Sequence, residues 1–140
     1  MSQLQILIDL TSLFIGFIFG SFVNVIVHRL PQNLSIIKPR SFCPECNKII
    51  PWHENIPILS WFFLRGKCSG CHLSIPVKYP LIETFTGILF FFSYKCTLYN
   101  TGIENYVFNL CVNWGITLIL LSLSIIDYYY LWIPNTIIRI

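Results

Sequence analysis

Two stretches of the chain are long and apolar enough to predict membrane-spanning helices without further argument. Leu10–Val27 is broken only by small or mildly polar residues, and it reaches spanning length when Leu4–Leu10 is included. A helix needs about 20 such residues to cross a bilayer. Val107–Ile126 reaches that length by itself and carries no charge, so it is the clearest spanning segment.

A third apolar stretch, Leu81–Tyr94, is shorter and is interrupted by Glu83. It reaches about 18 residues only when it is extended at one end, so it predicts a third span less strongly. The tail, 128–140, is aromatic and apolar but too short to cross, which predicts the start of a fourth helix. We therefore expect an all-α polytopic membrane protein with about three transmembrane helices and a partial fourth.

Between Leu10–Val27 and Leu81–Tyr94, residues 28–80 have a different character. This segment is rich in proline and has little pattern for a long helix. About 50 residues cannot bury a large core, so a module of this size normally needs a metal ion or disulfides. The predicted organisation is a first transmembrane helix over 1–27, a loop domain over 28–80 and a second membrane region over 81–140. No internal repeat is evident.

The first helix also carries a regular pattern of small residues. Ser12, Gly16 and Gly20 recur at every fourth position, the spacing that lets two helices approach closely in lipid. We expect this face to pack against another helix.

Composition agrees with a membrane protein and excludes an ordinary soluble domain. The chain is 55% hydrophobic and only 11% charged, with a mean hydropathy of +0.68, whereas soluble domains carry about 25% charged residues. Seven of its nine basic residues lie in the loop domain, at positions 29, 38, 40, 48, 65, 67 and 78. The positive-inside rule then predicts a cytoplasmic loop and an external amino terminus. We expect the lipid membrane as a partner and no nucleic acid.

The strongest chemical signal is a pair of Cys-x-x-Cys motifs in the loop domain. Cys43 and Cys46 form the first motif, and Cys68 and Cys71 form the second after a longer interval. Four thiolates satisfy a tetrahedral, closed zinc site, which is structural and does not activate water. Disulfides or redox chemistry, and an empty thiol cluster, stay open as alternatives, although cytoplasmic thiols are normally reduced.

The remaining cysteines and the nearby histidines predict little chemistry. Cys96 and Cys111 lie in or beside apolar stretches, where cysteine usually acts as a small hydrophobic residue. His53 and His72 lie near the cysteines and could replace one of them as a ligand, but four thiols already complete a set.

Three carboxylates lie at or near the predicted spans, where ionisable groups are costly and often functional. Asp9 is expected at the outer interface in a plain interfacial role. Asp127 follows the third span at the inner boundary, where it either ends the helix or serves as a catalytic carboxylate. An aspartic protease needs a second carboxylate to share a proton, and Glu83 is the other one at a suitable depth.

A series of motifs in this order is similar to the amino-terminal part of bacterial prepilin leader peptidase/N-methyltransferases. The motifs are Gly20-Ser-Phe-Val-Asn-Val-Ile-Val-His-Arg-Leu-Pro31, Cys-Pro-Glu-Cys, Asn55-Ile-Pro-Ile-Leu-Ser-Trp61, Leu64-Arg-Gly-Lys-Cys68 and Tyr79-Pro-Leu-Ile-Glu83. Ile126-Asp127 with Ile133-Pro134 then resembles the start of the peptidase domain.

The resemblance implies a multi-pass protein of the bacterial inner membrane. Such enzymes cut the leader from type IV prepilins and type II secretion pseudopilins on the cytoplasmic side, and then methylate the new amino terminus with S-adenosylmethionine. By resemblance, Asp127 matches the first catalytic aspartate, Gly66 matches a glycine linked to methyl transfer, and the cysteine loop belongs to the methyl-transfer region.

Two departures from the family pattern limit what the resemblance predicts. Asn135 stands where the family usually has aspartate, and the Gly-x-Gly-Asp motif of the second catalytic aspartate is absent. We therefore expect the peptidase to be incomplete in this chain, with a separate carboxy-terminal fragment supplying the second aspartate. The alternative is a non-enzymatic, zinc-stabilised membrane adaptor or an inactive truncated homologue.

Overall fold

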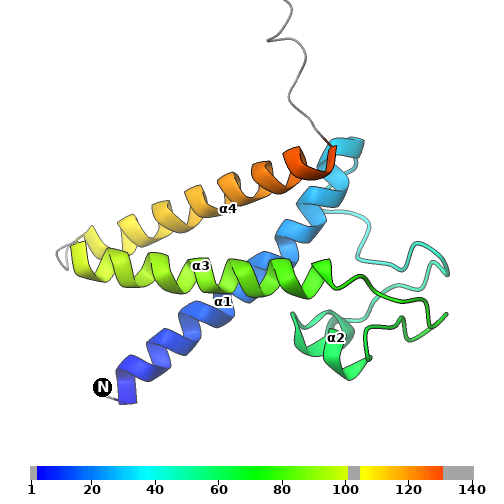
Figure 1. The fold of residues 1–140 in the computed structure, drawn as a ribbon, viewed down its shortest axis with the longest axis horizontal. Helices are drawn as coiled ribbons and strands as arrows, with labels where there is room; N and C mark the ends of the chain where they lie inside the picture. Colours follow the sequence, from blue (N-terminus) through cyan, green and yellow to red (C-terminus); the bar gives the residue numbers. More distant parts are fainter. Residues whose placement is uncertain (1–2, 101–104, 131–140) are drawn as a thin grey trace, which may run out of the picture.

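The computed structural model describes residues 3–100 and 105–130, and within them it confirms three helices of membrane-spanning length. These are α1 (Gln3–Arg29), α3 (Lys78–Asn100) and α4 (Tyr106–Tyr130), each long and apolar enough to cross a bilayer (Figure 1). The stretch Leu81–Tyr94, for which the sequence predicted a membrane span least strongly, is extended on both sides to the 23 residues of α3. The partial fourth helix was predicted on the tail, 128–140; residues 128–130 continue α4 instead, and 131–140 lie outside the described residues.

Helices α1 and α3 cross where glycines of α1 let the backbone of α3 approach closely. A methyl group on Gly16 would lie 2.6 Å from the Cα of Gly87, and one on Gly20 would lie 2.6 Å from the Cα of Glu83. Ser12, Gly16 and Gly20 are all buried. The small-residue face predicted from the sequence is thus confirmed as the packing face between α1 and α3.

Helix α4 packs along the same pair of helices. The ring of Trp114 stacks on Phe90 of α3 at 4.7 Å, and its Nε1 donates to the Phe90 carbonyl at 3.2 Å. Near the other end of α4, Ile126 is buried against Val23 and Val27 of α1. These contacts orient the carboxyl end of α4 toward the carboxyl end of α1.

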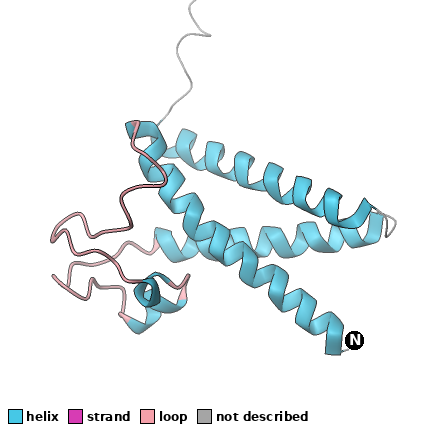
Figure 2. Cartoon of the chain, turned by 180° about the vertical axis from the view of Figure 1, so that it is seen from behind, coloured by secondary structure: helices cyan, strands magenta, loops and turns pink. Residues whose placement is uncertain are grey.

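The loop domain between α1 and α3 contains only short helices. They are η1 (Leu30–Gln32), η2 (Trp52–Asn55) and α2 (Leu59–Phe63), and the remainder is turns and extended backbone (Figure 2). The described residues form no strand, only isolated antiparallel pairs at Phe42–Ile49 and Lys67–Ser74. The all-α fold class with a small cysteine-bearing loop is therefore confirmed for the part of the chain that the structure describes.

The connections bring the loop domain, the start of α3 and the end of α4 to one end of the bundle (Figure 1). The Nζ atom of Lys78 lies 4.8 Å from the ring centroid of Tyr129, two residues after Asp127. The opposite end holds Asp9, whose two carboxylate oxygens each accept a bond of 2.7 Å from Lys95. Asp9 is thus engaged with a helix neighbour at the end of the bundle far from the loop domain.

Candidate metal centre and carboxylate site

The four sulfur atoms of the two Cys-x-x-Cys motifs converge on one point. All four lie within 4.8 Å of one another, with 3.7 Å between Cys43 and Cys71 and 3.9 Å between Cys46 and Cys68. A tetrahedron of sulfurs at zinc–sulfur bonds of about 2.3 Å has edges of about 3.8 Å. All four cysteines are free thiols, so the residues present fit one structural zinc ion.

Both motifs are folded in the same way. Each backbone hydrogen bond of the first motif recurs in the second, displaced along the sequence by the interval that separates Cys43 from Cys68. The Cys43 N–H donates to Lys48 and the Asn47 N–H donates back to Cys43; Cys68, Leu73 and His72 repeat this pattern. Asn47 and His72 both adopt a left-handed conformation, at φ 55° and 58°. Each motif is therefore a tight turn that presents two thiols on one side.

This repeat extends beyond the cysteines and was not evident from the sequence. The Ile50 N–H donates to Ser41, and the Ile75 N–H donates to Gly66 at the same offset. A proline follows each isoleucine, at 51 and 76. Few side chains recur because backbone hydrogen bonds define the turn, and the shared Cys-x-x-Cys-x-x-x-Ile-Pro spacing is the signal that could have found it.

The electrostatics of the cluster favour a bound cation. Backbone N–H groups of Cys71 and then Gly70 lower the pKa of the Cys68 thiol to about 6. For Cys71, the Leu73 N–H favours the thiolate, but desolvation and the neighbouring sulfurs outweigh it and raise the pKa to about 11. Ionisation of one thiol thus disfavours ionisation of its neighbours, because the negative charges repel each other. A divalent cation bound between the sulfurs would offset that repulsion.

A polar clamp joins the two turns beside the thiols. The Lys48 ammonium donates to Glu54 at 3.1 Å and to the Ser69 hydroxyl at 2.6 Å, while Ser69 donates to Glu54 at 2.5 Å. The Ser69 hydroxyl, followed by the Lys48 ammonium, keeps the pKa of the Glu54 carboxyl below its usual range. Neither His53 nor His72 belongs to the thiol cluster.

Gly66 is buried and has a clear structural reason to be glycine. Its φ of +64° is unfavourable for residues with a side chain, and an added Cβ would lie 2.8 Å from the Trp61 ring. Trp61 is fixed in turn, because its Nε1 donates to the Ile75 carbonyl at 3.0 Å. Gly66 thus lets the second cysteine turn pack on α2 through the indole.

Glu83 lies at the junction of the membrane helices and the loop domain. Its side chain is only 8% exposed, and one carboxylate oxygen accepts a 2.7 Å hydrogen bond from the Ile58 N–H. Ile58 adopts φ 63° and ψ −54°, the geometry of a strained γ-turn. The Leu59 N–H closes this turn onto the Pro57 carbonyl at 2.6 Å. Glu83 therefore holds a strained loop turn against α3.

Asp127 has a different environment from the other two membrane carboxylates. It lies at the end of α4 beside the buried Ile126, and its own side chain is exposed. The structure records no hydrogen bond or ion pair to Asp127 from the described residues. Asp127 is thus the exposed carboxylate of the three, and no contact within the described residues accounts for its position.

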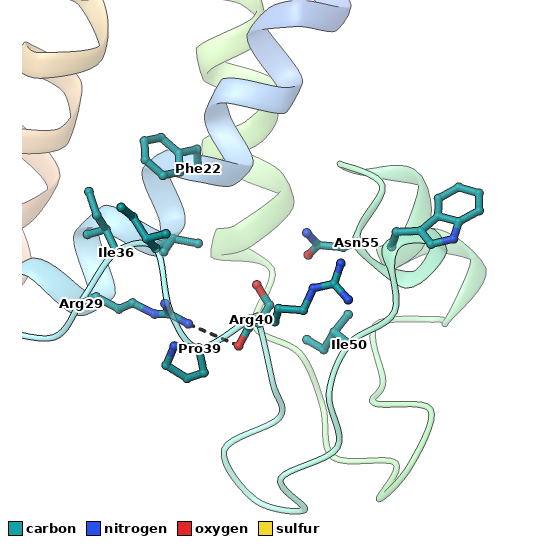
Figure 3. A pocket seen from close by; sticks show the side chains of 11 residues that line it. Phe22, Arg29, Ile36, Pro39, Arg40, Ile50 and Asn55 are labelled. Carbon is teal, nitrogen blue, oxygen red and sulfur yellow. Dashed lines mark hydrogen bonds between the residues drawn. The ribbon is translucent and has the colours of Figure 1, made fainter.

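A pocket opens where the loop domain meets the end of α1. It has a volume of about 260 Å³, and its polar lining includes Arg29, Arg40 and Asn55 (Figure 3). Trp52 also contributes to the lining. Arg29 is buried and donates to the carbonyls of Ser35 and Arg40. The Arg40 guanidinium has no recorded partner among the described residues and points into the space beside Asn55 (Figure 3). The lining thus includes a guanidinium with no recorded partner among the described residues and, elsewhere on its wall, an indole ring.

The comparisons place this architecture in a known group. The profile described as the bacterial peptidase A24 N-terminal domain matches residues 14–97, which include all four thiols, Gly66 and Glu83. A protein of Myxococcus xanthus named prepilin leader peptidase/N-methyltransferase is 52% identical over 77 residues, which cover 55% of this chain and 23% of that protein.

Other relatives match over more of the chain. A protein of the same name from Stutzerimonas stutzeri is 32% identical over 159 aligned positions, covering 92% of this chain and 50% of the relative. A type 4 prepilin-like proteins leader peptide-processing enzyme of Escherichia coli is 30% identical, with 86% and 49% covered. The chain thus spans half or less of the length of these relatives. No solved structure gives a significant match.

The first prediction concerns the thiols. The purified chain is expected to hold about one zinc ion, as four converging thiolates form one closed site. Replacing either Cys43 or Cys68 by serine should remove the metal and the protease resistance of the loop together, because the energy of metal binding is folding energy in such sites. Zinc content by mass spectrometry and limited proteolysis are the measurements.

Cys96→Ser and Cys111→Ser are the matched controls, because neither sulfur belongs to the cluster. Both should keep zinc and protease resistance. Full metal occupancy in the Cys43→Ser/Cys68→Ser double variant would contradict the assignment.

The second prediction concerns Gly66. Gly66→Ala should destabilise the loop domain by roughly 2 kcal/mol or more, because it adds left-handed strain to a clash with the Trp61 ring. Proteolysis of the loop should accelerate accordingly. Gly115→Ala is the control, as nothing lies within 4 Å of its added methyl group. Unchanged loop stability with loss of methyl transfer would instead indicate that Gly66 contacts a reactant.

Proposed function

The chain belongs to the family described as the bacterial peptidase A24 N-terminal domain, and we propose that it serves in removing leader peptides from prepilins and pseudopilins and in methylating the new amino terminus. Curated relatives named for both activities support this proposal. The alternative function is that of a non-enzymatic membrane adaptor, which would have the same zinc loop but would catalyse neither reaction.

One observation carries the proposal: the exposed Asp127 and the zinc-binding loop lie at the same end of the helix bundle (Figure 1). The two reactions act in succession on one peptide, since the amine that is methylated is the one that cleavage releases. A site for cutting at the membrane boundary and a loop domain beside it suit that order of events.

For cleavage, we assign Asp127 as one of two carboxylates. In such a pair, one carboxylate takes a proton from the attacking water while the other protonates the carbonyl oxygen of the scissile bond. The only other aspartate of the chain is Asp9, which is bonded to Lys95 at the opposite end of the bundle. The carboxylate of Glu83 accepts a hydrogen bond from the Ile58 N–H and so already has a structural role. We therefore assign the second aspartate to a Gly-x-Gly-Asp motif outside this sequence, on a carboxy-terminal segment or a separate fragment.

For methylation, we assign the binding of S-adenosylmethionine to the pocket of Figure 3, on the chemistry of two of its lining residues. The free guanidinium of Arg40 suits the carboxylate of the donor, since guanidinium and carboxylate can form two parallel hydrogen bonds. The indole of Trp52, 78% exposed, offers a face for the planar adenine. When bound, the donor supplies the methyl group; these two side chains would orient it at the membrane surface. Gly66 does not line this pocket and acts through Trp61.

The proposal also places the chain in the cell. We assign it to the bacterial inner membrane as a multi-pass protein, with the cysteine loop in the cytoplasm and the amino terminus outside, because the loop holds most of the basic residues. The organisation into 1–27, 28–80 and 81–140 is compatible with α1 ending at Arg29 and α3 beginning at Lys78. Zinc has a structural role only, as its site is closed by four thiols.

The third prediction tests cleavage. The 140-residue chain in vesicles should not cut a prepilin leader, because half of the acid–base pair is missing. Co-expression with the carboxy-terminal part of a relative should restore cleavage. In the restored enzyme, Asp127→Asn should lower the rate by roughly 10²–10⁴-fold or more, without loss of zinc.

Asp9→Asn is the matched control and should cleave at the normal rate. Normal cleavage by the Asp127→Asn enzyme would remove Asp127 from the catalytic pair, since α4 continues past it to Tyr130 and it does not end the helix either. If the chain cleaves alone, Glu83→Gln becomes the decisive variant. Failure of every combination, with zinc and folding intact, would favour the adaptor.

The fourth prediction tests the pocket by direct binding. S-adenosylhomocysteine has the carboxylate and adenine of the donor without its reactivity. Arg40→Met should weaken its binding in calorimetry by roughly tenfold or more, because a charge-assisted hydrogen bond is lost. Arg65→Met is the control, because Arg65 precedes Cys68 at the same spacing at which Arg40 precedes Cys43. Equal effects of the two substitutions would place the donor elsewhere.

A further inference from the structure

The segment from Asn55 to Phe63 lies deeper than a cytoplasmic loop would. Ile58 is bonded to Glu83, which is five residues inside α3 and so about 7 Å along the helix from Lys78. Glu83 also faces Gly20, nine residues or about 13 Å before the end of α1. Both helices therefore put the Ile58 turn inside their apolar spans.

A cavity between α1 and the loop supports this depth. It has a volume of about 390 Å³, and Ile56 and Pro57 share its wall with Phe14 and Ile18 of α1. Phe14 lies about four helical turns, or about 22 Å, before the end of that helix. The view from behind also shows α2 beside the start of α3 rather than beyond it (Figure 2).

The strained turn at Ile58 meets the condition that lipid imposes on non-helical backbone. Non-helical backbone is tolerated at membrane depth only where its polar groups are paired. Glu83 accepts from the Ile58 N–H, and Pro57 has no N–H to satisfy. Ser60 and Phe62 donate to the carbonyls of Ile56 and Ile58. The strained turn thus has its donors paired within the protein.

Helix α2 divides its side chains between the protein and the outside. Ser60 is buried and donates to the His53 carbonyl, and Trp61 donates to Ile75. Leu59, Phe62 and Phe63, at positions i, i+3 and i+4, share the other face. They are 51%, 65% and 84% exposed, a fully apolar surface at the level of the first turns of a spanning helix.

We propose that Asn55–Phe63 re-enters the leaflet on the loop side of the membrane, with Leu59, Phe62 and Phe63 in contact with phospholipid and Glu83 holding the turn at that depth. The occupant of this apolar face is the bilayer itself, because Ile58, next to the face, is bonded to Glu83 inside the candidate membrane span of α3. Arg65 and Lys67 follow α2 directly, where they would meet the phospholipid headgroups. This proposal does not depend on the proposed enzymatic function.

A photo-crosslinking amino acid at position 63 tests the proposal. The zinc-loaded chain carrying 4-benzoylphenylalanine in place of Phe63 would be irradiated in vesicles of phosphatidylcholine and phosphatidylglycerol, and adducts identified by mass spectrometry. Phe63 should give phospholipid adducts, as should Phe92, an exposed residue in the middle of α3. Phe42, a similarly aromatic and exposed residue of the first cysteine turn, should give none.

The outcomes decide the question in both directions. If position 63 behaves like position 42, the segment lies in water and the proposal fails. If it forms only protein–protein adducts, another polypeptide covers α2 and the bilayer is not its partner. Phospholipid adducts at 63 and 92 but not at 42 support re-entry.

A second pair of variants tests the role of Glu83 in setting the depth. Glu83→Gln keeps an acceptor for the Ile58 N–H, whereas Glu83→Leu removes it. The leucine variant should lower the yield of lipid adducts at position 63 by roughly fivefold relative to the glutamine variant, with adducts at 92 unchanged. Equal yields in the two variants would show that Glu83 does not hold the turn.

Discussion

The close crossing of α1 and α3 is the constraint on which the rest of the structure depends. In lipid there is no hydrophobic force between helices, so they associate where backbones can approach and pack. Gly16 and Gly20 provide that approach, opposite Gly87 and Glu83. The backbone of Glu83 lies so close to Gly20 that no side chain would fit there, so the crossing also determines the position of Glu83. The loop domain is attached to the carboxylate of this residue through the Ile58 N–H.

The loop domain is consequently held at two places by different physics. At one end, the cysteine turns bring four thiols together in a geometry that fits zinc, and an ion bound there would supply the stability that a module of this size cannot obtain from a core. At the other end, Glu83 fixes Ile58 against α3. Trp61 links the two, because it belongs to α2 and packs on Gly66 of the second cysteine turn.

Sequence patterns predicted those features that depend on local chemistry or on periodicity. The three spans, the packing face at Gly16 and Gly20, and the thiol set could be predicted because hydropathy, small-residue spacing and Cys-x-x-Cys pairs are direct consequences of lipid, helix geometry and zinc coordination. The partners of Glu83 and Gly66 could not. Both depend on tertiary contacts between residues that are distant in sequence, and Ile58 adopts a backbone conformation that isoleucine itself disfavours.

Tertiary contacts also distinguish the three membrane carboxylates from one another, whereas the sequence alone showed only that each lies at or near a predicted span. A buried or membrane-embedded carboxylate is costly unless it is paired. Asp9 is paired with Lys95, and Glu83 accepts from the Ile58 backbone, so each is accounted for by an interaction that stabilises the fold. Asp127 has no such recorded interaction among the described residues. Since it lies at the boundary next to the loop domain, hydration offsets the cost of its charge, and this position is the one that the proposed cleavage requires of a carboxylate that no packing contact accounts for.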